Sequence, residues 1–249
     1  SGDQTEIEEN SVLHIKLNGI PIVESAPDDD LGLPPLPYIG NTTTIGLNQI
    51  IKAIRTAAEN DDIKGIYLES GMLSAGQAHI LEIRNELNSF KEKGKFIVSY
   101  SEYYSEPGYF LSSVADEIYL NPIGDIEFNG FSSAPVFFKG MFEKLEIEPV
   151  IFRVGEFKSA IEPFILEKMS EENRLQTRTY LNDMNTVMVE QVANSRNLET
   201  EKVREINDGM LVRNGQDALD YKLIDGLWYD DQVITRLKDK LEISEEDED

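Results

Sequence analysis

Short runs of β-branched and aromatic residues alternate with helical patterns along most of the chain, and this alternation constrains the fold more than any other feature. The runs have the length of buried strands, whereas the helical patterns repeat apolar residues every three or four positions. We predict strands at residues 12–17, 63–68, 96–100, 118–120 and 150–154. Repeated strand-helix units of this kind predict an α/β fold with a largely parallel sheet.

Two helices before residue 95 are predicted from the residues expected at their ends. A helix of about four turns is predicted from Gly46, and Ser74 is predicted to cap a second helix that ends at Gly94. Before that second helix, Gly71 and Gly76 flank a turn. Such glycines can offer backbone N–H groups to an oxyanion, but the intervening Met72-Leu73 pair favours a tight turn that needs positive φ.

After residue 130, helix starts and ends are predicted mainly from the positions of proline and serine. Pro135 is expected to start one, because proline is favoured at the first helical position. Pro163 is expected to break any helix begun at Ser159. Ser170 opens a helix of about seven turns with an apolar stripe. Shorter helices are predicted at residues 199–206 and 232–241.

Lys158 is the candidate catalytic residue. It follows the predicted strand at residues 150–154, and ligands in open α/β sheets bind in the crevice beyond the carboxyl ends of the strands. The alternative is a solvated surface lysine, because most of the 23 Lys and Arg residues must face water.

Residues 155–164, Gly-Glu-Phe-Lys-Ser-Ala-Ile-Glu-Pro-Phe, are followed by Met169, Ser170 and a long amphipathic helix. This stretch resembles the lysine motif of the signal peptide peptidase A family, which consists of membrane-anchored serine peptidases with a Ser/Lys dyad. The similarity extends from residue 12 to the Leu-Ile-Asp-Gly at residues 223–226 and resembles the first half of the long, two-domain form. The resemblance implies a ClpP/crotonase-like spiral of strand-helix units, Lys158 as the general base, and remnant signal peptides as substrates.

The resemblance also implies how the protein is organised. We expect a flexible start with a cloning remnant at residues 1–10, a single α/β domain with a long C-terminal helical part at residues 11–241, and an acidic tail or interdomain linker at residues 242–249. A membrane anchor would precede residue 1 and a second half would follow residue 249. The expected location is the bacterial cytoplasmic membrane, with the catalytic domain on the periplasmic or extracytoplasmic side. The expected partners are the second half and further copies in a homo-oligomer.

The nucleophile of the resembled family is absent from this half. In that family a serine on a strand-to-helix turn is followed by two glycines and then by aromatic residues. Gly108-Tyr109-Phe110 resembles the end of this pattern, which places Pro107 at the first glycine and Glu106 at the serine. A serine on a sharp elbow needs neighbours without a Cβ. Ser105 is therefore not expected to be catalytic, and the serine is expected from the second half.

Composition excludes several classes of function. The formal charge of −24 repels phosphate backbones, so we expect no nucleic-acid partner. The chain has no cysteine, the acidic triplet at residues 28–30 lacks the ligand spacing of a calcium loop, and we expect no cofactor or metal. His14 and His79, the two histidines, are predicted to lie at the surface. Residues 24–40 are predicted to form a proline-rich loop.

Two other functions stay open. One is a crotonase-like enzyme acting on acyl thioesters, for which Glu106 would supply a carboxylate. The other is a non-catalytic half that builds an oligomer. A lysine base also requires a lowered pKa; Phe157, Ile161 and Phe164 could supply the burial, whereas two flanking glutamates, at positions 156 and 162, could oppose it.

Overall fold

The computed structural model describes residues 7–25, 44–150 and 159–243. Its contacts divide the chain into two compact units. The larger unit comprises residues 1–129 and 190–249, and the smaller unit comprises residues 130–189. The single domain predicted for residues 11–241 stays a prediction. Most of the proline-rich loop, the strand predicted at residues 150–154 and most of the acidic tail lie outside the described residues.

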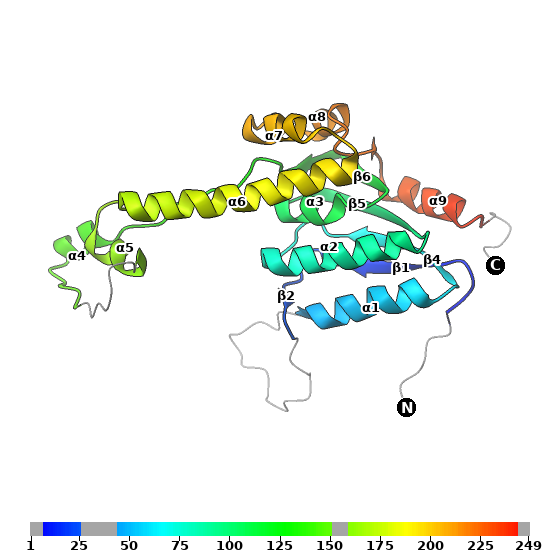
Figure 1. Cartoon of the computed structure of the whole chain (residues 1–249), viewed down its shortest axis with the longest axis horizontal. Helices are drawn as coiled ribbons and strands as arrows, with labels where there is room; N and C mark the ends of the chain where they lie inside the picture. Colours follow the sequence, from blue (N-terminus) through cyan, green and yellow to red (C-terminus); the bar gives the residue numbers. More distant parts are fainter. Residues whose placement is uncertain (1–6, 26–43, 151–158, 244–249) are drawn as a thin grey trace. The chain divides into compact units, whose positions relative to one another are not determined.

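A five-stranded sheet forms the centre of the larger unit (Figure 1). The spatial order is β1-β4-β5-β6-β7, and every neighbouring pair is parallel. The strands are β1 (Ser11–Lys16), β4 (Ile63–Glu69), β5 (Phe96–Tyr104), β6 (Glu117–Ile126) and β7 (Gly226–Leu227). A separate parallel pair consists of β2 (Ile22–Val23) and β3 (Ile45–Gly46). Each strand of the five-stranded sheet is added beside the previous one, which confirms the predicted α/β class with a parallel sheet.

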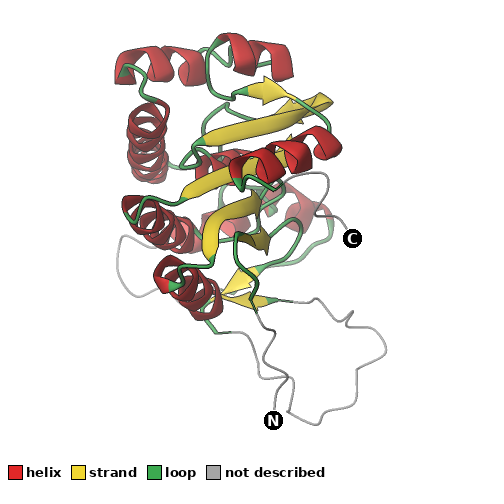
Figure 2. Ribbon diagram, turned by 90° about the vertical axis from the view of Figure 1, so that its right-hand side faces the viewer, coloured by secondary structure: helices red, strands yellow, loops and turns green. Residues whose placement is uncertain are grey.

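Helices lie on both sides of this sheet (Figure 2). They are α1 (Leu47–Glu59), α2 (Gln77–Glu92), α3 (Glu106–Ser112), α7 (Thr200–Asp208), α8 (Gly215–Asp220), α9 (Asp230–Lys240) and the C-terminal end of α6 (Glu171–Arg196). Of the apolar positions that predicted α1, Leu47, Ile50, Ile51 and Ile54 are buried, whereas Ala58 is only partly buried. The predicted helices at residues 199–206 and 232–241 are confirmed to within two residues at each end.

Both faces of the sheet are buried, as expected for a parallel sheet. In β4, Ile66 and Leu68 point to one face and Tyr67 to the other, and each is at most 2% exposed. The Tyr67 face belongs to a cluster completed by Val233 and Leu237 of α9. Helix α9 therefore covers one face, and its burial depends on aromatic residues of the strands.

The start of α2 differs from the prediction. Gly76, not Ser74, is its N-cap residue, with φ −68°. Ser74 instead forms an isolated parallel bridge with Pro21, and its carbonyl accepts a hydrogen bond from Ile22 N at 2.9 Å. Because these contacts hold Ser74 in extended backbone, the helix starts later. Gly94 ends α2 as predicted, with φ +81°.

The smaller unit is helical in its described part. It contains α4 (Lys139–Lys144), a short 3₁₀ helix (Ser159–Ile161), α5 (Glu162–Ile165) and the first part of α6. The helix predicted from Pro135 is present, but its predicted start is wrong, because regular helix begins only at Lys139. Pro163 does not break a helix but occupies the first turn of α5, where its missing N–H costs nothing. Helix α6 has 26 residues, which confirms the predicted seven turns.

Ser170 caps α6 as predicted and is part of a polar cluster with Glu162. Ser170 Oγ accepts a hydrogen bond from Asn173 N at 3.2 Å and donates one to Glu162 Oε1 at 2.6 Å. Asn173 Nδ2 donates to Glu162 Oε2 at 2.9 Å. A carboxylate at a helix N-terminus also interacts favourably with the helix dipole, so this cluster fixes where α6 begins.

Candidate functional site

The predicted base lies outside the described residues. The structure describes the chain as far as Val150 and again from Ser159, so it contains no geometry for Lys158. The candidate site that can be built is the turn between β5 and α3 in the larger unit, to which the resemblance assigns the nucleophile position.

Ser105 is the N-cap of α3, and its hydroxyl is occupied. Its Oγ donates a hydrogen bond to Gly71 O at 2.7 Å and accepts one from Gly108 N at 3.3 Å. Its own N–H also donates to Gly71 O, at 2.9 Å. No base is among these partners, so within the described residues Ser105 has the contacts of a capping serine and not those of an activated nucleophile.

Glu106 occupies the position that the resemblance assigns to the nucleophile, and it is turned inward. The residue is only 7% exposed. Its Oε1 accepts hydrogen bonds from Asn129 N at 3.0 Å and from Asn207 Nδ2 at 3.3 Å. A buried carboxylate held by donors from two other segments stabilises the fold. This geometry gives no support to the crotonase-like alternative, in which Glu106 would face a substrate.

The glycine turn after β4 is packed against this elbow. A Cβ on Gly71 would lie 1.9 Å from Ser101 Oγ and 2.1 Å from Tyr103 O, and one on Gly108 would lie 2.1 Å from Gly71 O. Neither Gly71 nor Gly76 has positive φ. The prediction that this turn needs positive φ is therefore wrong, and glycine is required at position 71 because the backbones approach closely.

The N–H groups that follow Gly71 already have acceptors inside the protein. Met72 N donates to Asn18 Oδ1 at 3.2 Å, and Leu73 N donates to Ser105 Oγ at 3.4 Å. An oxyanion hole needs N–H groups directed at the substrate oxygen. The N–H groups of Met72 and Leu73 are therefore not a pair of free donors.

A crevice lies beyond the carboxyl ends of β1, β4 and β5. It has a volume of about 600 Å³, and its lining includes Lys16, Glu69, Tyr100, Glu102 and Asp230. Glu69 contacts Lys16 at 4.0 Å, and Asp230 accepts a hydrogen bond from Tyr67 at 2.8 Å. The serine in this lining, Ser101, donates its hydroxyl to Tyr103 O at 2.8 Å, so its hydrogen bond goes to the backbone and not to a general base.

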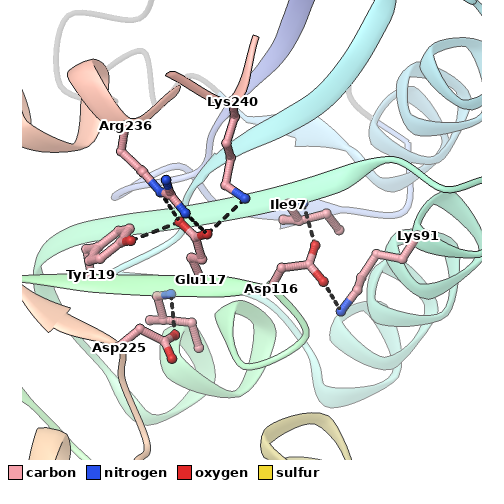
Figure 3. A network of polar contacts seen from close by, with 9 residues as sticks. Lys91, Ile97, Asp116, Glu117, Tyr119, Asp225, Arg236 and Lys240 are labelled. Atoms are coloured by element: carbon pink, nitrogen blue, oxygen red, sulfur yellow. Dashed lines mark hydrogen bonds and ion pairs between the residues drawn. The ribbon is translucent and has the colours of Figure 1, made fainter. Parts of the chain in front are cut away.

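Charged residues missed by the sequence reasoning form a cluster between β6 and α9 (Figure 3). Arg236 Nε and Nη2 lie 3.0 and 2.8 Å from the two oxygens of Glu117, and Lys240 Nζ lies 2.8 Å from Glu117 Oε1. Tyr119 OH donates to Glu117 Oε2 at 2.8 Å. Although burial opposes ionisation, these hydrogen bonds lower the pKa of Glu117 to about 2. The cluster joins α9 to the sheet, and no signal in the local sequence pairs residues 119 positions apart.

The histidines have ordinary structural partners. His14 is exposed as predicted, lies 2.6 Å from Glu69 and stacks on Tyr67. His79 is partly buried, with a side chain 24% exposed, and lies 3.4 Å from Glu24. Among the described residues, no three His, Asp or Glu side chains are grouped so as to hold a metal ion. Within the same part of the chain, no helix has the length and hydropathy needed to cross a bilayer.

Comparisons with known proteins point to one family. The sequence profile of peptidase family S49 matches residues 89–244. Protease 4 of Haemophilus influenzae is 36% identical over 155 residues, which are 62% of this chain and 25% of that protein. Protease 4 of Salmonella typhi is 32% identical over 189 residues, covering 73% of this chain and 31% of that protein.

A plant protein shows the same relationship. The chloroplastic serine protease SPPA of Arabidopsis thaliana is 31% identical over 203 residues, which are 81% of this chain and 30% of that protein. The chain thus spans between a quarter and a third of the length of these relatives.

Proposed function

Because this chain belongs to peptidase family S49, we propose that it is the lysine-bearing half of a membrane-associated serine endopeptidase that degrades remnant signal peptides. Lys158 is the general base for a serine in a second half of the protein. The protein works as an oligomer at the extracytoplasmic side of the membrane, through an anchor outside the chain described here.

The observation that carries this proposal is the position of Glu106. Where family resemblance expects a serine, the chain has a carboxylate that is 7% exposed and accepts hydrogen bonds from Asn129 and Asn207. The adjoining N–H groups of Met72 and Leu73 have protein acceptors as well. A half that has lost its nucleophile but retains the lysine motif supports a division of the dyad between two halves.

In the proposed mechanism, neutral Lys158 takes the serine proton as the hydroxyl attacks the peptide carbonyl and returns it to the leaving amine. A lysine starts near pKa 10.4, so burial or a nearby cation has to lower its pKa by several units. Glu162, four residues after Lys158, accepts hydrogen bonds from Ser170 and Asn173 at the start of α6. These donors hold the Glu162 carboxylate at the N-terminus of α6.

The test is a lysine substitution in the full-length protein. We expect Lys158→Ala to abolish peptidase activity and to leave the melting temperature nearly unchanged, because a general base is required for proton transfer and not for folding. Lys158→Arg should fail as well, since a guanidinium is not deprotonated near neutral pH. Lys168→Ala, at an exposed lysine of the same unit, is the matched control and should retain activity. Normal turnover by Lys158→Ala would refute the assignment.

Labelling locates the nucleophile independently of turnover. A serine-directed phosphonate should label the full-length protein beyond residue 249 and should not label the 249-residue chain, which should also fail to cleave peptides. A label on a serine of this chain would show that the nucleophile lies in this half.

A further inference from the structure

A groove in the smaller unit has an unusual charge for this protein. Its volume is about 440 Å³, and α6 contributes Arg174, Arg178 and Leu181 to its lining. The chain between β6 and α4 contributes Phe131 and Phe137, and Met169 lies just before α6. We call it the arginine groove. Two guanidinium groups thus line the same groove as these apolar side chains, which we call its apolar wall, and as the polar Ser133, Thr177 and Asn182, in a chain whose net charge is −24.

The two arginines lack a partner within the described chain. They are four residues apart on α6, so their side chains share a face, where like charges destabilise a helix. Neither forms an ion pair or a side-chain hydrogen bond with another described residue. Arg55, Arg196 and Arg236 each form an ion pair with a carboxylate, whereas Arg204 and Arg213, like the two arginines of the groove, form none with another described residue. An unpaired arginine pair beside a groove is the arrangement that binds a carboxylate bidentately.

The apolar wall restricts what can carry that carboxylate. Phe131, Phe137 and Leu181 would gain little from a hydrophilic anion, because only apolar surface removed from water is stabilised there. The acidic run at residues 245–249 of this chain contains no apolar side chain, so it fits the arginines but not the wall. A ligand with an apolar body and one terminal anion satisfies both.

We propose that the arginine groove binds the free C-terminal carboxylate of an apolar peptide. This rests on the proposed function. A signal peptide has an apolar core and small residues before its cleavage site, and cleavage leaves it with an α-carboxylate that the uncut precursor lacks. The groove therefore distinguishes a remnant signal peptide from a precursor that still carries its protein.

Binding of matched peptides tests this proposal without any turnover. Three fluorescent peptides are titrated into the 249-residue chain and followed by anisotropy: a Leu/Ala peptide with a free C-terminus, the same peptide amidated, and a Gly/Ser peptide with a free C-terminus. We expect the apolar acid to bind about tenfold more tightly than the amide, which corresponds to about 1.4 kcal/mol. The Gly/Ser acid should bind more weakly than the apolar acid, because it cannot use the wall.

Variants assign the effect to the groove. Arg174→Gln and Arg178→Gln should each reduce the preference for the acid, and the double variant should remove it. Lys144→Gln removes one positive charge from an exposed site of the same unit outside the groove, and it should leave the preference intact. Arg178→Lys should restore only part of it, because an ammonium lacks the bidentate fork.

Equal affinity for the acid and the amide would overturn the proposal. Equal affinity for the Gly/Ser and Leu/Ala acids would also overturn it, because the groove would then bind the carboxylate alone and make no use of the apolar residues. A preference that survives the double variant would place carboxylate binding elsewhere. Each titration can be repeated with Lys158→Ala. Peptide binding by the groove is thus measured independently of whether Lys158 is the general base.

Discussion

Replacing Glu117 by Gln tests whether the ionic cluster under α9 stabilises the fold. In the folded protein this carboxylate accepts two hydrogen bonds from Arg236, one from Lys240 and one from Tyr119. Glutamine preserves the size of the side chain but removes the charge. Its amide group also places donors against the donors of Arg236 and Lys240, so the helix loses an ionic attachment and gains a mismatch.

The pKa of Glu117 sets the size of the effect. Its lowering from 4.5 to about 2 would correspond to about 3 kcal/mol at about 1.4 kcal/mol per pKa unit. Solvent screening reduces this figure, because the Arg236 side chain is 40% exposed. We therefore expect Glu117→Gln to lower the free energy of unfolding by about 2 kcal/mol at pH 7. For a chain of this size that is a shift in melting temperature of roughly 4–8 °C.

The pH dependence identifies the cause. A carboxyl group whose pKa is lower in the folded than in the unfolded state stabilises the fold above its unfolded pKa, and this stability is lost as the pH falls through the folded pKa. The difference between wild type and Glu117→Gln should therefore be full above about pH 5 and should narrow as the pH falls towards about 2. Thermal unfolding followed by far-UV circular dichroism at several pH values measures it.

The matched control is Glu102→Gln, which removes a carboxylate from an exposed position of the sheet and should leave the melting temperature nearly unchanged. A Glu117→Gln protein as stable as the wild type at pH 7 would refute the reasoning. A loss that stays constant across the pH range would assign the effect to packing and not to charge.

Three further substitutions test the turn between β5 and α3 and the glycine turn packed against it. Ser105→Ala and Glu106→Gln should each leave turnover of the full-length protein within about threefold of the wild type. Ser105→Ala should lower the free energy of unfolding by about 1 kcal/mol, because α3 loses its N-cap. A drop in turnover of about a hundredfold for Ser105→Ala would mean that the nucleophile is in this chain. Gly71→Ala should destabilise the protein by more than about 2 kcal/mol, because its Cβ would lie 1.9 Å from Ser101 Oγ. Gly76→Ala, where a Cβ would meet nothing within 4 Å, is the control, and equal melting temperatures for the two alanine variants would contradict the close-approach argument.

The parallel sheet and the long helix were predictable because local patterns specify them. Ile66 and Leu68 lie in a run that is apolar on both faces, which is typical of a buried parallel strand. Ser170 could be identified as the cap of α6 from its position before a helical pattern. The absence of a nucleophile at Glu106-Pro107 stays a prediction, based on the neighbours without a Cβ that a sharp elbow requires.

Sequence patterns did not predict features whose local structure depends on contacts with distant segments. Ser74 is a good capping residue, but its bridge to Pro21 keeps it extended. The inward position of Glu106 depends on Asn207, which is 101 residues away in the sequence. The requirement for glycine at position 71 comes from the backbone of Tyr103. None of these contacts leaves a periodic signal, so sequence patterns could not reveal them.

The packing of the edge strand β7 has a spectroscopic consequence. The only tryptophan of the chain, Trp228, directly follows β7 and stacks on Tyr119 of β6 with ring centroids 4.1 Å apart. Its emission therefore reports the corner where α9 meets the sheet, and residues 130–189 contain no tryptophan at all. Fluorescence will follow the melting of the larger unit alone, whereas circular dichroism sums over all helices. Superimposable melting curves from the two probes would mean that both units unfold as one cooperative block.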